Sequence, residues 1–310
     1  MNEKFVISCS PHIRGNNSTA VVMRDVLIAL LPALLASVWL FGMRALILTL
    51  VCVVFAVGSE YVFQKATGKP ITVNDYSAAV TGMILAFNLP STLPYWMAAL
   101  GSIIAIVVVK QLFGGIGRNF ANPAITARIV LLVSFAGPMT TWAVPKPVSP
   151  DFVTGATPLG MMASGNVGAL PTLSQMFLGL RGGSLGETCS FALLIGLAYL
   201  LYRKVITWHI PAAFVGTVAV LTAVLGENPF YHVLSGGLLL GAIFMATDYT
   251  TSPFTDKGKL IFGVGCGILT VIIRVYGNYP EGVSFAILLM NILCPHIDNW
   301  TRNKALGGNY

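Results

Sequence analysis

Apolar residues in this chain gather into long runs separated by short stretches rich in polar residues, Gly or Pro. Most runs continue for roughly 16–20 residues without the apolar–polar alternation of a barrel strand, so they predict membrane-spanning helices. Ten candidate spans result, at about 25–42, 45–63, 76–89, 95–112, 123–137, 187–202, 208–225, 231–246, 259–274 and 282–297. The predicted fold class is an all-α polytopic membrane protein.

The ten spans divide into two similar halves. The third and eighth spans are both short for a full crossing, and each is followed by a polar, Pro-containing turn. Matching positions are Gly82 and Gly241, Lys110 and Arg274, and Phe120 and Phe285, at offsets of 159, 164 and 165. Five spans in each half is an odd number, so we expect two inverted five-helix repeats with a site near the membrane midplane.

Composition and charge support this interpretation and orient it. Of 310 residues, 55% are hydrophobic and only 9% charged, against about 25% charged in a soluble domain. With the N-terminus inside, thirteen of the 18 Lys and Arg residues lie in inner segments, four lie in outer loops, and Arg128 lies within the fifth span. Because Lys and Arg favour the cytoplasmic side, we expect both termini in the cytoplasm.

The expected organisation follows from these boundaries. It comprises a cytoplasmic N-terminal arm (1–24), a first repeat (25–137), an extracytoplasmic loop (138–186), a second repeat (187–297) and a cytoplasmic C-terminal tail (298–310). No small-residue cleavage site follows the first apolar run, so we expect a retained helix rather than a signal peptide. The five cysteines and four histidines show no metal-ligand spacing, and no metal site is predicted.

The long outer loop contains an unusual small polar segment, which reads Asp151-Phe-Val-Thr154-Gly-Ala-Thr157. Gly155 and Ala156 would allow the active site of another protein to approach the backbone closely. The Thr157 hydroxyl is a competent acceptor for phosphoryl chemistry once an enzyme activates it. We expect Pro158 to keep the segment out of regular structure. By local sequence alone, an ordinary turn is the simpler interpretation.

Two further elements offer polar chemistry near the membrane. In the Gly-rich segment 113–124, Asn119 and Asn122 could use their amides to bind a ring system with carbonyls and ring nitrogens. Asn122 precedes Pro123, so helix capping is an equally good explanation for that residue. Asp248 follows the short eighth span, where a carboxylate either belongs to an ion path or serves as a helix-end charge.

Together these motifs resemble a known family over essentially the whole chain. The heptapeptide ending at Thr157 resembles the motif at which a flavin transferase attaches FMN through a phosphoester to the last Thr. Further shared elements are Ser10-Pro11-His12, Val80-Thr81-Gly82, Gly114-Gly115-x-Gly117-x-Asn119-x-x-Asn122-Pro123-Ala124, Gly186-Glu187, Ser235-Gly236-Gly237, Met245-Ala246-Thr247-Asp248 and Asn291…Pro295-x-x-Asp298. The family contains the D subunit of Rnf complexes and the B subunit of the sodium-pumping NADH:quinone reductase. The short N-terminal arm is more similar to the Rnf branch.

The resemblance implies a function. Such a subunit would relay electrons between reduced ferredoxin and NAD⁺ through FMN on Thr157, within a complex of the bacterial cytoplasmic (inner) membrane that moves Na⁺ or H⁺. Other iron–sulfur and flavin subunits would be its partners, and a flavin transferase would mature it. A second, non-covalent flavin, such as riboflavin, is expected near Asn119 and Asn122. Two alternatives remain: a solute channel or transporter of the same architecture, and a structural anchor for redox partners.

Overall fold

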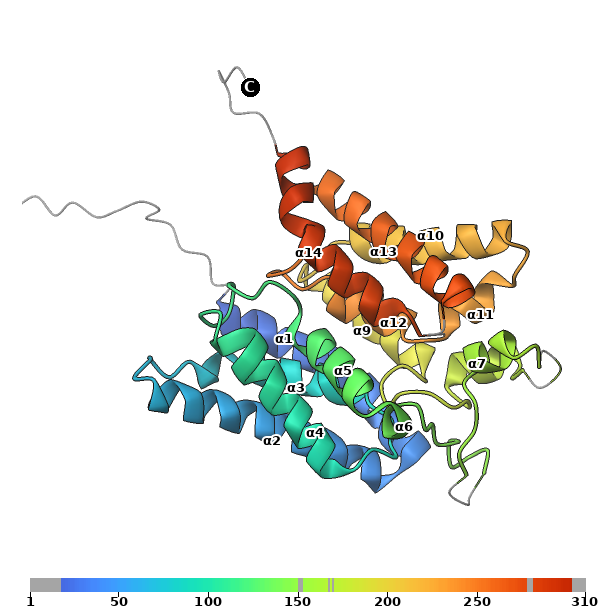
Figure 1. Ribbon diagram of the computed structural model, residues 1–310, viewed down its shortest axis with the longest axis horizontal. Coiled ribbons are helices and arrows are strands. Elements are labelled where there is room, and N and C mark those ends of the chain that lie inside the picture. Colours follow the sequence, from blue (N-terminus) through green and yellow to red (C-terminus); the bar gives the residue numbers. More distant parts are fainter. Residues whose placement is uncertain (1–17, 150–152, 167, 169, 278–280, 303–310) are drawn as a thin grey trace, which may run out of the picture.

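The computed structural model describes residues 18–149, 153–166, 168, 170–277 and 281–302. Within these residues the regular secondary structure consists of helices, joined by loops. The one β-type pairing there is an isolated antiparallel bridge between Ala143 and Thr154. Figure 1 shows the N-terminal half, blue to green, lying below the C-terminal half, yellow to red. The prediction of an all-α membrane protein is confirmed at this level.

The N-terminal half consists of long apolar helices and one distorted one. Its elements are α1 (Thr19–Phe41), α2 (Met43–Ala66), the 3₁₀ turn η1 (Val73–Asp75), α3 (Ser77–Phe87), α4 (Tyr95–Ile103), the π-helix η2 (Ile104–Gln111) and α5 (Pro123–Ser134). Helix α2 packs on both α3 and α4, and α5 packs on α4 and η2. Gly82 of α3 permits this packing, because a Cβ there would lie 2.8 Å from the Cys52 carbonyl oxygen of α2.

The C-terminal half is also built from helices that pack along one another. Its elements are α9 (Ser190–Tyr202), α10 (His209–Val224), α11 (Pro229–Leu234), α12 (Leu238–Leu240), the π-helix η4 (Gly241–Met245), α13 (Asp256–Tyr276) and α14 (Val283–Thr301). Helix α10 packs along α13, and α13 packs along α14. Most of these helices, like those of the first half, lie within the predicted apolar runs, but the predicted eighth span, 231–246, is divided among α11, α12 and η4.

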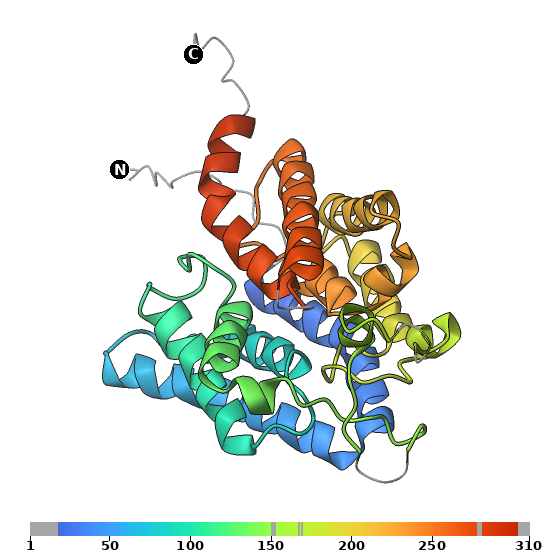
Figure 2. The same cartoon turned by 45° about the vertical axis from the view of Figure 1, so that its right-hand side comes forward.

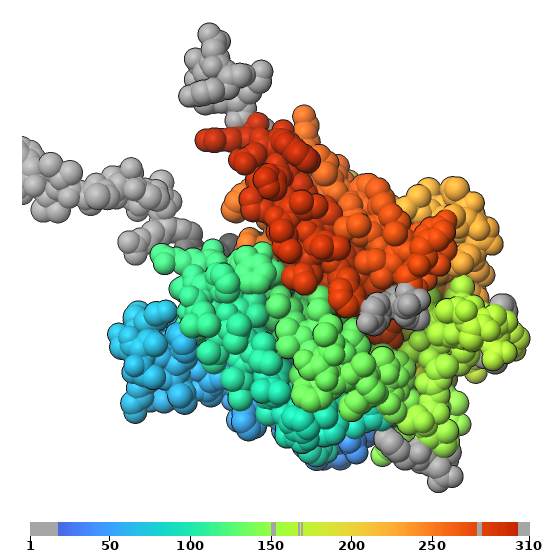
Figure 3. Space-filling model, in the orientation of Figure 1, coloured from blue at the N-terminus to red at the C-terminus, as the bar shows by residue number. Residues whose placement is uncertain are grey.

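The two halves meet along two helix pairs, α1 with α9 and α5 with α14. Figure 2 shows α14 rising beside the green α5, and in Figure 3 the side chains of the two halves meet without a gap along this line. Gly196 of α9 allows the first contact, because a Cβ there would lie 2.5 Å from the Ala29 carbonyl oxygen of α1. One large cluster of buried apolar residues extends through both halves.

The lengths of the helices and their exposed apolar side chains are typical of a protein that spans a lipid bilayer. Three of them, Thr19–Phe41, Met43–Ala66 and Asp256–Tyr276, have the length and apolar character needed to cross a membrane. Five further apolar helices are shorter, at 10–17 residues. Large apolar side chains such as Leu35, Val54 and Val133 point outward with 71%, 63% and 71% exposure, as expected where the surroundings are hydrocarbon rather than water.

The segment 138–186 is less irregular than its sequence predicts. It begins within α6 (Ala136–Met139) and contains two short helices, α7 (Pro158–Ala163) and α8 (Leu173–Leu178). The described part of the Thr157 segment, residues 153–157, nevertheless lies outside regular structure as expected, with only the isolated bridge at Thr154. Proline has no N–H to lose at the first position of a helix, so Pro158 begins α7 instead of preventing it.

Candidate functional site

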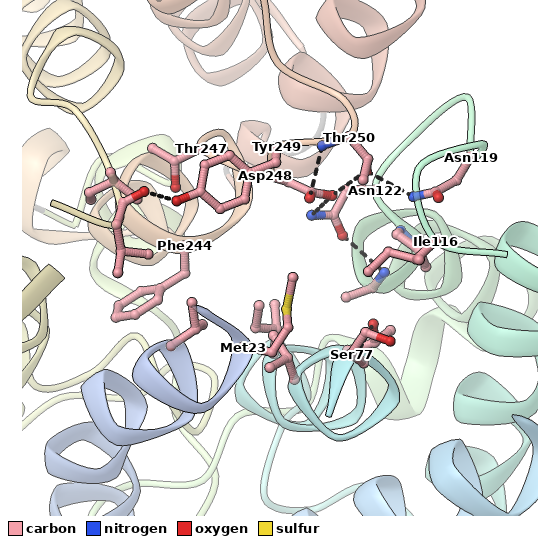
Figure 4. A pocket seen from close by; sticks show the side chains of 18 of the residues that line it. Met23, Ser77, Ile116, Asn119, Asn122, Phe244, Thr247, Asp248, Tyr249 and Thr250 are labelled. Atoms are coloured by element: carbon pink, nitrogen blue, oxygen red, sulfur yellow. Dashed lines mark hydrogen bonds between the residues drawn. The ribbon is translucent and has the colours of Figure 1, made fainter. Parts of the chain in front are cut away.

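Three of the four candidate residues lie in one pocket between the halves. This asparagine pocket, lined by Asn119, Asn122, Asp248 and surrounding apolar side chains, has an empty volume of about 750 Å³ including open solvent. Figure 4 shows the two asparagines and Asp248 converging on it, opposite Met23, Ser77 and Phe244.

Asn122 both caps a helix and faces the pocket. Its Oδ1 accepts the N–H groups of Ala124 and Ile125 at 3.0 and 3.3 Å, which starts α5 behind Pro123. Its amide nitrogen donates to the Met245 carbonyl at 3.3 Å and to Asp248 at 3.5 Å. The capping role weighed from the sequence is thus present, and the same side chain joins the two halves across the pocket.

Asn119 is positioned differently. Its amide nitrogen donates to the Thr250 hydroxyl at 3.1 Å, whereas its Oδ1 is buried and has no partner. A buried oxygen without a donor is costly, and Asn119 lies in the pocket lining. The orphaned oxygen therefore fits a ligand that carries an N–H group, such as a flavin ring.

Asp248 is held by its own loop. Its carboxylate accepts bonds from the Thr250 amide and hydroxyl at 3.3 and 3.1 Å and from the Thr251 hydroxyl at 3.4 Å. Burial raises the pKa of Asp248 above its ordinary value, although the Thr250 and Thr251 bonds and the charge of Lys110 partly oppose this shift. The geometry places the carboxylate at the pocket edge as a loop-fixing group.

Both π-helices of the described chain contribute to this pocket. Lys110 of η2 and Ile243 and Phe244 of η4 line it. Single π-helical turns inside helices are rare and frequently mark functional sites. The buried Lys110 is paired with the fully buried Glu60 at 2.8 Å, a contact that the sequence analysis did not anticipate. The sequence signal for this pair was the presence of two ionisable residues inside or beside apolar runs. Burying such residues costs free energy unless they pair with each other.

Thr157 lies in a second pocket, apart from the asparagines. This threonine pocket, lined by Thr157, Trp142, Arg128, Glu281, Ser284 and mainly apolar neighbours, has an empty volume of about 830 Å³ including open solvent. Thr157 is 8% exposed. Its hydroxyl caps α7 by accepting the Gly160 N–H at 3.2 Å. Asp151, the first residue of the motif, lies outside the described residues.

The backbone around Thr157 is fixed by two neighbouring contacts. The Gly155 N–H donates to the Trp142 carbonyl at 3.0 Å, and Thr154 forms the bridge with Ala143. A Cβ on Gly155 would lie 3.1 Å from Val144. The small residues before Thr157 therefore let the segment lie close against the strand-like stretch 142–144, which places Thr157 at the pocket.

A buried ion pair faces Thr157 across this pocket. Arg128 of α5 donates to Glu281 at 2.8 Å and also to Ser284 of α14. The Arg128 Nε and the Glu281 Oε1 have no partner. Burial and the charge of Glu187 raise the pKa of Glu281 to about 7, against the opposing effect of Arg128. A cation with a spare donor suits the anionic phosphoester that FMN on Thr157 would place here. Sequence analysis noted Arg128 inside a span but gave it no role.

Helix α5 connects the two pockets. Pro123 and Ala124 line the asparagine pocket, and Arg128, Ile129 and Leu132 line the threonine pocket. With a rise of about 1.5 Å per residue, Ala124 and Arg128 are separated by roughly 6 Å along the helix axis. Groups bound in the two pockets would therefore lie on opposite parts of one short helix.

Fold and sites together define a polytopic helical membrane protein with two pockets, one of them lined by Thr157. The model of the family described as NQR2, RnfD, RnfE matches residues 6–307. This chain belongs to that family.

Individual relatives are similar over their full length. The chain is 50% identical to the D subunit of the Na(+)-translocating ferredoxin:NAD(+) oxidoreductase complex of Acetobacterium woodii, with 99% of this chain and 97% of that protein covered. It is 43% identical to the D subunit of the proton-translocating ferredoxin:NAD(+) oxidoreductase complex of Clostridium ljungdahlii, with 98% and 96% covered. The D subunit of the ion-translocating oxidoreductase complex of Halorhodospira halophila is 39% identical, with 96% and 94% covered.

Proposed function

We propose that this chain is the flavin-carrying membrane subunit of a redox-driven ion pump that transfers electrons between reduced ferredoxin and NAD⁺. The activities for which the relatives are named, at 50% and 43% identity over nearly the whole chain, support this function. One of those relatives is named for Na⁺ and the other for protons, so their names leave the ion open.

The first cofactor of the proposal is FMN joined through its phosphate to the Thr157 hydroxyl. The observation that carries it is the position of this hydroxyl at a pocket of about 830 Å³ that also contains Arg128. When bound, a flavin supplies one-electron transfer. The chain's own part is to present Thr157, to offer the Arg128 guanidinium to the phosphoester, and to surround the ring with apolar side chains such as Ile129 and Leu132.

The second proposed cofactor is a non-covalent flavin, riboflavin, in the asparagine pocket. The orphaned Asn119 oxygen supports it, because a flavin ring offers an N–H donor to such an acceptor. Asn122 would orient the ring from the α5 side, and Met23, Ile84 and Phe244 would exclude water.

We further propose that ten spans form two inverted five-helix repeats. The support is equivalent packing: α2 lies on α4 as α10 lies on α13, and the two halves meet through the corresponding helices α1 with α9 and α5 with α14. Both termini would face the cytoplasm of a bacterial cell, with the Thr157 loop outside. Iron–sulfur and flavin subunits of the same complex would be the partners, and a flavin transferase would attach the FMN.

Mass spectrometry and flavin extraction test the cofactor proposals. Protein co-expressed with a flavin transferase should carry one FMN on the peptide containing Thr157, and acid denaturation should release riboflavin but not that FMN. Neither covalent FMN nor riboflavin would be found in a solute transporter of the same architecture or in a purely structural anchor.

A further inference from the structure

Lys110 is a buried cation that faces the asparagine pocket. Its side chain is 3% exposed and lies between Glu60, at 2.8 Å, and the Ser77 hydroxyl, at 2.6 Å. A lysine ammonium has three N–H donors, and these two contacts use two of them. Since Lys110 and Ser77 both line the pocket, the remaining donor is available to what binds there.

The surroundings hold this ammonium in place. The Glu60 Oε1 accepts from Lys110, from Gln111 at 2.6 Å and from Gln64 at 3.5 Å. Successive residues of an α-helix point about 100° apart, so Lys110 and Gln111 would not ordinarily reach one oxygen. The π-helical turn of η2 contains both residues and coincides with their convergence on Glu60. A rare backbone distortion thus accompanies the placement of one cation.

Lys110 is also the only cation among the described residues that line this pocket. The negative groups near it are Glu60 behind it, Asp75 behind Ser77 at 2.5 Å, and Asp248 at the pocket edge. The field of Lys110 reaches Asp248, whose pKa it helps to hold down. The pocket thus has one fixed positive pole on its α3 and η2 side, opposite the asparagines.

We propose that Lys110 donates its third N–H to a carbonyl oxygen of the flavin in the asparagine pocket, as a positioning residue that also sets the reduction potential of that flavin. This inference rests on the proposed non-covalent flavin. A cation beside a ring that gains negative charge on reduction favours the reduced form, and low dielectric strengthens the effect. Glu60 moderates it by partly neutralising the ammonium.

The test compares three variants of the assembled complex. Lys110→Met/Glu60→Gln replaces the ion pair by neutral groups and avoids an unpaired buried carboxylate. Glu60→Gln alone leaves the ammonium with less compensation. Lys69→Met is the matched control, because Lys69 contacts the Gln111 carbonyl at 3.4 Å and does not line the pocket. Riboflavin content and affinity and the reduction potential of the non-covalent flavin are measured for each.

We expect the double variant to bind riboflavin about 10- to 100-fold more weakly, as the loss of a charge-assisted hydrogen bond implies. Its remaining flavin should have a lower reduction potential, whereas Glu60→Gln should raise the potential. The Lys69 control should match wild type. Opposite shifts from the two variants distinguish a field effect from loss of structure, and Glu60→Gln provides the decisive reading if the double variant does not assemble.

Two negative results separate the inference from the proposed function. A wild-type complex without extractable riboflavin would overturn the second flavin itself, and the role of Lys110 with it. Wild-type riboflavin, together with unchanged affinity and potential in the double variant and in Glu60→Gln, would overturn the role of Lys110 alone.

Discussion

The asparagine pocket and the threonine pocket are built in different ways. The asparagine pocket draws its lining from α1, α3, η2, α5, α9, η4 and the loops after η2, α9 and η4. Asn122 links the halves by bonding to Met245 and Asp248. The threonine pocket is lined by α5, α6, α7, α14 and the connecting segments around Thr157 and Glu281. In the proposed function, the threonine pocket would hold its flavin through a covalent bond to Thr157, whereas the asparagine pocket would hold its flavin by non-covalent contacts alone.

The charges of the two pockets also differ. In the threonine pocket Arg128 and Glu281 both line the cavity, and each retains an unpartnered atom. In the asparagine pocket Lys110 lines the cavity while its partner Glu60 is fully buried behind it. The first arrangement suits a ligand that carries its own phosphate charge. The second sets one cation, Lys110, in a lining that also includes the Asp248 carboxylate, which suits a ligand without a net charge of its own.

The largest expected effect concerns the covalent attachment of FMN to Thr157. Thr157→Val keeps the shape of the side chain but removes the hydroxyl, so covalent FMN should be lost completely, as measured by in-gel flavin fluorescence and peptide mass spectrometry. Riboflavin in the asparagine pocket should remain, because it depends on other residues. Loss of the α7 cap should cost only about 1 kcal/mol.

The matched control for that experiment is Thr154→Ala. Thr154 contacts Ala143 through its backbone bridge, so the flavin should stay on Thr157 even if its yield falls. Flavin on any other residue, in wild type or in either variant, would contradict the assignment of Thr157 as the attachment site.

The second expected effect is a difference in accessibility between the two sides of the membrane. In a background without native cysteines, Ser164→Cys, near the threonine pocket, should react with an impermeant maleimide in whole cells. Lys257→Cys, at the start of α13 after the Asp248 loop, should react only after permeabilisation. Both positions are exposed. The reverse pattern would place the Thr157 loop in the cytoplasm.

The sequence predicted the positions of the helices well because apolar runs in lipid have few alternatives to helix. Capping of α5 by Asn122, one of the two explanations offered by the sequence, is confirmed, since Asn before Pro is a local signal. The sequence could not predict that Asn119, Asn122 and Asp248 share a pocket. Asn119 meets Thr250 across 131 positions of sequence, and only packing of the two halves brings such residues together.

Other features could not be predicted from the sequence, for related reasons. The α7 helix is too short to leave a periodic pattern, so the sequence did not predict that a helix begins at Pro158. The Lys110–Glu60 and Arg128–Glu281 pairs join residues from different helices or loops. Lys110, Glu60 and Glu281 are each compatible with a helix end and Arg128 lies within a span, but the sequence does not show which of these residues pair.

A third, intermediate effect distinguishes the two asparagines. Asn122→Ala removes the cap of α5 and should lower the free energy of unfolding by about 1 kcal/mol, and it should also release riboflavin. Asn119→Ala removes only the Thr250 contact and the orphaned oxygen, so stability should change little while riboflavin binding weakens. Asn122→Asp keeps the capping oxygen as a control. Thermal unfolding and extractable flavin report the two effects separately, and equal riboflavin in all variants would argue against a flavin in this pocket.

The smallest expected effect concerns Asp248, which the structure ties to its loop while leaving it in the pocket lining. If the carboxylate also serves the ion path, Asp248→Asn should slow ion-coupled ferredoxin:NAD⁺ turnover and weaken its dependence on the coupling cation, with both flavins retained. Burial raises the pKa of Asp248, so it keeps its proton to a higher pH than an exposed aspartate does. Acidification through that raised pKa should therefore bring wild-type turnover towards that of the Asn variant, which has no proton to gain there. Thr250→Ala, which removes one loop bond and keeps the charge, is the control for a purely structural role. Wild-type turnover and cation dependence in Asp248→Asn would leave the carboxylate as a group that fixes its loop and takes no part in transport.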